Sequence, residues 1–168
     1  MGVKVKWNVK KSDLDRMMKN AKAVNGTSVE VGAFEGEHAW LMGIHEYGCS
    51  ILVTDKMRGW LGANGLHLNP KTTHIHIPER SVLRAGYDKH SKVVTRHAKL
   101  LLADVVAGRI STNTLYKTVG EDLSGRIKEY GVDLGSPGNH PFTVDRKGSS
   151  NPLVGEGDML EGITWRKA

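Results

Sequence analysis

The longest regular pattern of apolar positions runs through the middle of the chain. Apolar residues and histidines recur there at steps of three and four: Leu83, Tyr87, His90, Val94, His97, Leu101 and Val105. This spacing predicts one amphipathic helix. With Ser81 as its N-cap and Gly108 as its stop, the helix has roughly 27 residues and a length of about 40 Å. A helix of that length predicts that the other elements pack along it.

A second helical pattern follows almost at once. Its apolar residues lie four positions apart, at Leu115, Val119, Leu123 and Ile127. Ser111 or Thr112 is the predicted cap, and the helix is expected to end near Gly131. Because only about three or four residues separate the two helices, they are expected to form an antiparallel αα-hairpin.

Strict alternation of apolar and polar residues predicts short strands near both ends of the chain. Residues 3–9 and residues 28–34 alternate in this way and are expected to pair with each other. Residues 163–166 are predicted to form a terminal strand. Between the first two strands, a capping box of Ser12 and Asp15 predicts the start of a short amphipathic helix.

Residues 49–77 predict a projecting β-arm, a hairpin with an irregular tip. Residues 51–54 and 73–77 read as its two strands, and large apolar residues are scattered between them among glycines. These groups have no burial site of their own in the arm, so they imply either a loop that tucks back or burial against another subunit. The candidate interface with a subunit or partner therefore consists of Met57, Trp60, Leu61 and Leu66.

The patterns together predict an α+β fold class: a small antiparallel sheet packed on a long αα-hairpin, with a projecting β-hairpin arm. Residues 132–152 are rich in Gly, Ser, Pro and Asn and predict a long loop, of a kind that is usually functional or mobile in compact domains. A length of 168 residues predicts one domain, covering residues 1–168.

The charge of the chain leaves a second function open. There are 24 basic and 18 acidic residues, a formal net charge of +6, and eight histidines. This balance permits contact with nucleic acid without requiring it, so a nucleic-acid-binding module is the alternative function. The single cysteine, Cys49, excludes an intramolecular disulfide and is typical of a protein made in a reducing cytoplasm. No run of about 18 apolar residues predicts a membrane span.

No set of residues predicts an active site. His74-Ile75-His76 places two imidazoles on one face of a strand, but a metal site needs a third and usually a fourth ligand. His45-Glu46 lacks the second histidine of a zincin motif, and no glycine pattern forms a phosphate loop. We therefore expect no catalytic residue, no cofactor and no metal. A metal-dependent enzyme that uses His74 and His76 is a further alternative, and it would need additional ligands.

Three segments carry a resemblance to a known family, in chain order. The first is Ile44-His45-Glu46-Tyr47-Gly48, which ends a short helix before the arm. The second is Ile77-Pro78-Glu79-Arg80-Ser81-Val82-Leu83-Arg84, which opens the long helix. The third is the closing segment Asn151-Pro152-Leu153-Val154-Gly155-Glu156-Gly157-Asp158-Met159. Together they resemble the neck and tail-completion proteins of tailed phages, a group similar to the virion-morphogenesis proteins of Mu-like phages.

The resemblance implies a structural virion protein, not an enzyme, that is made in the host cytoplasm and joins head to tail. Such proteins form a homo-oligomeric ring at the head–tail junction, here of sixfold or twelvefold symmetry. The implied partners are the head connector or adaptor and the tail terminator or tail tube, with genomic DNA passing through. In a ring each subunit meets the next through two different surfaces, for which the arm and the helix pair are the expected candidates.

Overall fold

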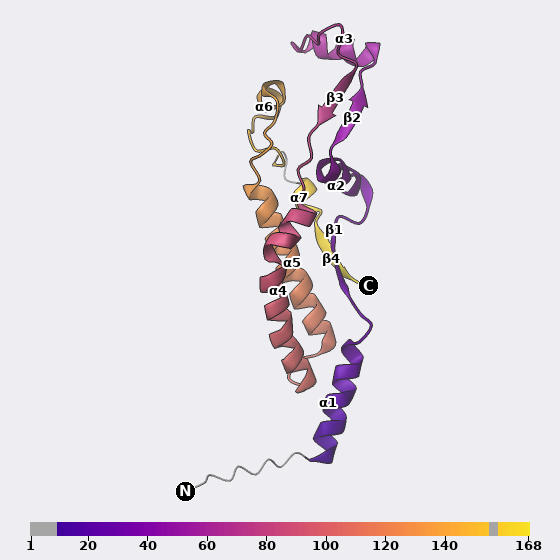
Figure 1. Cartoon of the computed structure of the whole chain (residues 1–168), viewed down its shortest axis with the longest axis vertical. Coiled ribbons are helices and arrows are strands. Elements are labelled where there is room, and N and C mark those ends of the chain that lie inside the picture. Colours follow the sequence, from indigo (N-terminus) through magenta and orange to yellow (C-terminus); the bar gives the residue numbers. More distant parts are fainter. Residues whose placement is uncertain (1–9, 155–157) are drawn as a thin grey trace.

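Two long antiparallel helices form the axis of the molecule, and the arm projects beyond one end of this pair (Figure 1). The computed structural model describes residues 10–154 and 158–168. Its elements, in chain order, are α1 (Lys11–Val24), β1 (Val29–Gly32), α2 (Gly36–Tyr47), β2 (Cys49–Leu52), α3 (Asp55–Ala63), β3 (His74–Ile77), α4 (Leu83–Val106), α5 (Thr112–Asp133), α6 (Pro141–Lys147), α7 (Asp158–Glu161) and β4 (Thr164–Lys167).

The helix pair α4 and α5 confirms the predicted αα-hairpin. The stop after α4 lies where it was predicted, since Gly108 has a φ of +75°, a conformation that suits glycine. The predicted cap of α5 is also present, because Ser111 Oγ accepts a hydrogen bond of 3.0 Å from the backbone N–H of Thr114. The α+β class predicted from the hydrophobic pattern is therefore the class of the fold.

Glycines allow two close approaches to α5. A Cβ atom at Gly86 of α4 would lie 3.2 Å from Ile127 Cγ1, so the two helices meet closely at this point. At Gly120 of α5 a Cβ atom would lie only 2.3 Å from Trp165 Cδ2. The indole of β4 thus occupies the space that any larger residue at position 120 would need.

The strands form two separate antiparallel ribbons of two strands each. β1 pairs with β4, with Val29 opposite Lys167, and this ribbon lies against α5. β2 pairs with β3, with Cys49 opposite Ile77, and this ribbon is the arm. The expected partner of β1, a strand at residues 3–9, lies outside the described residues. Among the described residues, the strand that pairs with β1 comes from the C-terminal end of the chain.

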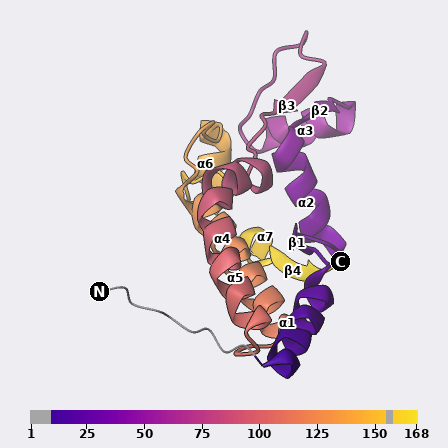
Figure 2. The same cartoon turned by 60° about the horizontal axis from the view of Figure 1, so that its bottom comes forward.

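The core lies where α2, α4, α5, α7 and the β1–β4 ribbon meet, as Figure 2 allows the reader to follow. Its buried members come from segments far apart in the sequence: Met42, Val82, Val94, Leu123, Ile127, Leu153, Leu160 and Ile163. Helix α1 contributes no buried side chain and lies at the end of the helix pair opposite the arm.

Two local expectations outside the arm and α4 are wrong. The capping box of Ser12 and Asp15 is not formed, because Lys10 holds the N-cap position of α1 and no side chain caps that helix. Residues 132–152 are not a loop throughout, because α6 lies among them. Pro141 occupies its first turn, and Gly148 ends it in the left-handed conformation with a φ of +68°.

Candidate assembly site: the arm and its root

The ribbon of the arm has two chemically different faces. Cys49 lies opposite Ile77 and Ile51 opposite Ile75, so these four residues share one apolar face. The other face is polar except for Leu52, which is exposed. A ribbon of two strands cannot bury both of its faces by itself, so the arm presents apolar surface to its surroundings.

The tip of the arm is an ordered helix and not the irregular segment that was expected. Thr54 caps α3 by accepting a hydrogen bond of 3.2 Å from the backbone N–H of Met57. Arg58 of α3 then fixes the returning chain, since its guanidinium donates to the carbonyl oxygens of Asn69 at 3.0 Å and Thr72 at 2.6 Å. The tip is therefore built by local capping and by one arginine.

The four candidate interface residues differ in what they offer to a partner. Leu61 is only 7% exposed and is buried within the tip, and Met57 and Leu66 are partly buried. Trp60 is 52% exposed, so it is the one of the four that has most of its surface available. The structure thus brings the four residues into one small tip, three of them turned at least partly inward.

One arginine connects the tip of the arm with α6. The guanidinium of Arg146 lies 5.0 Å from the ring centre of Trp60 and 5.8 Å from that of Phe142. Its Nη1 donates to Asn64 Oδ1 at 2.7 Å. Cation–π contacts of this kind contribute about 0.5–1 kcal/mol at exposed sites. Helix α6 therefore braces the tip, although the sequence of this region predicted only a loop.

At the root of the arm, a buried carboxylate from α2 lies against the N-terminus of α4. Glu46, 3% exposed, accepts hydrogen bonds from the backbone N–H groups of Val82 at 2.7 Å, Leu83 at 2.9 Å and Arg84 at 3.0 Å. The hydroxyl of Ser81 donates to it at 2.6 Å, and Arg84 Nε at 3.0 Å. A carboxylate at a helix N-terminus satisfies the free N–H groups there and interacts favourably with the helix dipole.

Arg80 completes this root by fixing the segment that follows α5. It is 5% exposed, and it donates to the carbonyl oxygens of Pro137 at 2.7 Å and Gly138 at 3.0 Å and to Asn139 Oδ1 at 3.2 Å. Its own backbone N–H donates to the carbonyl oxygen of His45 at 2.7 Å. We call Glu46, Arg80, Ser81 and Arg84 together the polar junction.

The electrostatics of the polar junction follow from burial and hydrogen bonding. Burial acts to raise the pKa of Glu46, but the bonds from Ser81 and from the backbone and side chain of Arg84, with that of Leu83, hold it below its ordinary value. Burial, and then the positive charge of Arg80, lowers the pKa of His45. The carboxylate is therefore kept charged and the imidazole is kept neutral in the folded chain.

The polar junction fixes where the arm points. β2 begins directly after Gly48 and β3 ends directly before Pro78, so both strands start from the junction. Gly48 has a φ of +67°, and a Cβ atom there would lie 2.8 Å from the carbonyl oxygen of Ile77. The backbone can take this path only with glycine. The first two motifs of the sequence thus meet in space and carry the arm.

The described part of the third motif has a separate, structural task. Asn151 Oδ1 accepts hydrogen bonds from the backbone N–H groups of Leu153 at 3.0 Å and Val154 at 3.2 Å, and its Nδ2 donates to the carbonyl oxygen of Val132 at 2.6 Å. This turn places Leu153 in the core. The residues of the motif at 155–157 lie outside the described residues.

The two histidines that the metal alternative invokes lie on the polar face of the arm. His74 and His76 are both exposed and stack on each other with ring centres 6.4 Å apart. Within residues 10–154 and 158–168, no group of three or more His, Cys, Asp or Glu side chains is placed to hold a metal ion. In the same ranges, no helix is both long and apolar enough to cross a membrane.

The outer face of α4 carries a row of cations that the sequence pattern did not single out. Lys89, Lys92, Arg96 and Lys99 follow one another at steps of three and four, so they lie on one side of the helix over about 15 Å. All four are exposed, and none forms an ion pair within the part of the chain that the structure describes. We call these four residues the α4 basic stripe.

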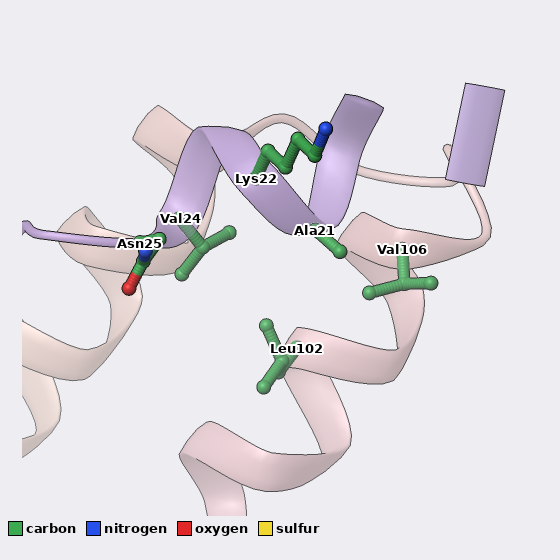
Figure 3. Close-up of a pocket in the computed structure, with 6 residues that line it drawn as sticks. All are labelled: Ala21, Lys22, Val24, Asn25, Leu102 and Val106. Atoms are coloured by element: carbon green, nitrogen blue, oxygen red, sulfur yellow. The ribbon is translucent and has the colours of Figure 1, made fainter. Parts of the chain in front are cut away.

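A hollow of about 500 Å³ separates α1 from the second half of α4 (Figure 3). Val24 of α1 and Leu102 of α4 point toward one another across it, with Val106 beside them. Two hydrogen bonds hold this end of α1: Tyr116 Oη donates to the carbonyl oxygen of Val24 at 3.2 Å, and Asn20 Nδ2 to that of Val106 at 3.5 Å. The hollow is open, and its lining is apolar apart from Lys22 and Asn25.

Comparison of the chain with known protein families, with curated proteins and with solved structures found no match. The site is therefore interpreted from its own geometry. That geometry is an apolar arm held in a fixed direction by a buried polar junction, with a basic stripe on the adjoining helix.

Proposed function

We propose that this chain is a ring-forming structural protein at the head–tail junction of a tailed phage, where it joins the head connector to the tail tube or terminator. The observation that carries the proposal is the meeting of the two motifs that resemble neck and tail-completion proteins. Glu46 comes from the first motif, and Arg80, Ser81 and Arg84 come from the second. Residues that resemble those of a family in sequence are here the residues that aim the arm.

The exposed apolar residues of the arm support a role in assembly. Leu52 and Trp60 are exposed on the arm, while Tyr87 and Leu100 are exposed on α4. Exposed apolar groups on two different parts of one chain suit a heterologous contact, in which the arm of one subunit meets the helix pair of the next. Repetition of such a contact by rotation closes a ring. Sixfold and twelvefold symmetry are both compatible with this contact.

The exposed tryptophan of the arm allows a matched test. Trp60→Ser should leave the chain folded and reduce its assembly on tail tubes or heads at least tenfold. The control is Trp40→Ser on α2, because Trp40 is 65% exposed and lies off the arm. Assembly is measured by co-sedimentation with the particles, and folding by circular dichroism. Equal assembly of both variants and the parent chain would remove the arm from the proposal.

Deletion of residues 56–70 is the stronger version of this test. The backbone N–H of Val53 donates to the carbonyl oxygen of Thr73 at 2.9 Å, so the ribbon can be closed by a short turn once the tip is removed. We expect a folded chain that no longer assembles on the particles. Undiminished assembly of this variant would contradict an arm-mediated ring.

The α4 basic stripe favours nucleic-acid binding as a second candidate function. Four cations that contact phosphates would give a salt slope of about −3.6, which lowers affinity by roughly 100-fold between 50 and 200 mM salt. Replacing Lys92 and Arg96 by alanine should halve that slope, whereas Lys117→Ala on α5 should not change it. Binding of duplex DNA that is weak at low salt, or is unchanged in the double variant, would exclude this candidate.

A further inference from the structure

One edge of β1 is unpaired within the described residues. Ser28 and Ala168 exchange both of their backbone hydrogen bonds, at 3.1 and 3.0 Å. In an antiparallel ladder, hydrogen-bonded and non-hydrogen-bonded pairs alternate, so Glu30 and Gly32 bond toward β4. The backbone N–H and C=O groups of Val29 and Val31 then point to the opposite edge. Among residues 10–154 and 158–168, no strand pairs with that edge.

An apolar groove runs beside this free edge, between β1 and α4, with α5 as its floor. It holds two hollows of about 220 and 280 Å³. Val29 lines both of them, together with residues of α4 such as Leu102 and Tyr87 and residues of α5 such as Val119. No residue of β4 lines either hollow. The space for one more strand thus lies on the free side of β1.

We propose that residues 3–9 of a second copy of this chain add to β1 as a third strand and fill this groove. The segment reads Val3-Lys4-Val5-Lys6-Trp7-Asn8-Val9, with apolar residues at every second position. As a strand beside β1, it satisfies the free backbone groups and turns its valines and tryptophan toward the floor of the groove.

Charge on the outer face of β1 fits the same strand. Glu30 points away from the floor and accepts a hydrogen bond of 2.8 Å from Arg166 Nε on β4. A third strand on the other side of β1 brings Lys4 or Lys6 next to the same carboxylate. Opposite charges on neighbouring strands attract each other. The lysines that alternate with the apolar residues therefore have a partner on this face.

The length of α1 argues for a second copy as the donor. Val24, at the end of α1, lines the hollow of about 220 Å³ in this groove. The fourteen residues of α1 place Lys10 about 20 Å away from that hollow. An extended chain covers about 3.3 Å per residue, so roughly six residues are needed to run back along α1. About three of the first nine residues would then remain for β1, and Trp7 would not reach the groove of its own chain.

Strand donation of this kind links one copy to the next through two different surfaces. The donor surface is the segment before Lys10, and the acceptor surface is the β1 edge with its groove. This inference rests on the proposed ring, to which it adds a second contact besides the arm. Because a donated strand is held by backbone hydrogen bonds as well as by apolar burial, it would tie neighbouring subunits firmly.

The test is a disulfide between two full-length chains. Cys49→Ala removes the native thiol from both; one chain then carries Glu30→Cys, and the other, with a different mass tag, carries Lys4→Cys or Lys6→Cys. Glu30 lies at a non-hydrogen-bonded position toward the added strand, where opposite Cα atoms are about 4.5 Å apart and a disulfide fits. After mild oxidation we expect at least tenfold more linked heterodimer than with Lys11→Cys as control.

Each result of this experiment has one meaning for the inference. A yield of linked heterodimer equal to that of the control overturns strand donation, while a ring in the sedimentation profile of the parent chain would leave the proposed function standing. When both cysteines are placed in one chain, links within single chains would overturn donation by a second copy. A linked closed dimer that never grows supports donation and contradicts the ring.

Discussion

Replacing Glu46 by glutamine should destabilise the fold far more than the loss of one charge on the surface would. The carboxylate accepts five hydrogen bonds, three of them from the backbone N–H groups of Val82, Leu83 and Arg84 at the start of α4. A glutamine amide keeps one acceptor oxygen and turns an NH₂ group toward donors. At least two of the five bonds are then lost, and N–H groups are left without an acceptor.

The size of the effect follows from burial. Glu46 is 3% exposed, so water cannot replace the lost acceptor. Each buried N–H group that is left without an acceptor costs about 1–3 kcal/mol, so two lost bonds cost about 2–6 kcal/mol together. For a domain of this size, each kcal/mol lowers the melting temperature by about 2–4 °C. We therefore expect a fall of about 4–24 °C at neutral pH.

The assay is thermal and urea unfolding followed by circular dichroism, with Glu79→Gln as the control. Glu79 also pairs with Arg84, at 2.8 Å, but its side chain is exposed, so its loss should cost less than about 1 kcal/mol. Because hydrogen bonds hold the pKa of Glu46 below its ordinary value, its contribution is present above about pH 4.5 and is lost as the pH falls further. The difference between Glu46→Gln and the parent should therefore shrink in acid. A loss below about 1 kcal/mol at neutral pH would refute this account of the polar junction.

Two further predictions concern α5 and the histidine beside the polar junction. Gly120→Ala should destabilise the chain by about 1–3 kcal/mol, because its Cβ would lie 2.3 Å from Trp165. The control Gly125→Ala, whose Cβ would meet nothing within 4 Å, should stabilise the chain by about 0.5–1 kcal/mol. Urea unfolding measures both effects, and equal effects would contradict the packing of β4 on α5. Burial lowers the pKa of His45, so the unfolded chain takes up a proton before the folded chain as the pH falls below about 6.5. The free energy of unfolding should therefore decrease in that range. His45→Asn should remove that part of the decrease, and an unchanged pH profile would show that His45 does not cause it.

The helix pair and its class could be predicted from the sequence because local periodicity determines them. The steps of three and four in α4 and the cap at Ser111 both act within a few residues. The cap of α4 could not be found in this way. Ser81 was predicted to provide it, but the acceptor for the N–H of Val82 is Glu46, 36 residues earlier in the chain. No local sequence pattern predicts a hydrogen-bond partner at that distance.

The candidate interface stays a prediction, and the structure shows only how exposed its residues are. Trp60 is exposed as the interface hypothesis requires, while Leu61 is buried in a helix that was read as an irregular tip. Two glycines within α3 weakened its helical pattern, although the Thr54 cap was a usable signal. Arg80 was noticed only through a family resemblance, and Glu46 through that resemblance and as part of an incomplete zincin motif. Their physical role, which is to aim the arm, depends on contacts that only the fold creates.

The measurement that tests the central proposal most directly is the mass of the purified chain in solution, determined alone and then with tail tubes or DNA-filled heads. We predict either a ring or a smaller species that becomes a ring on the particle, and the loss of that ring when residues 56–70 are deleted. A stable monomer that binds neither tail tubes nor heads would contradict the proposal. If that monomer bound duplex DNA through the α4 basic stripe, the nucleic-acid function would take its place.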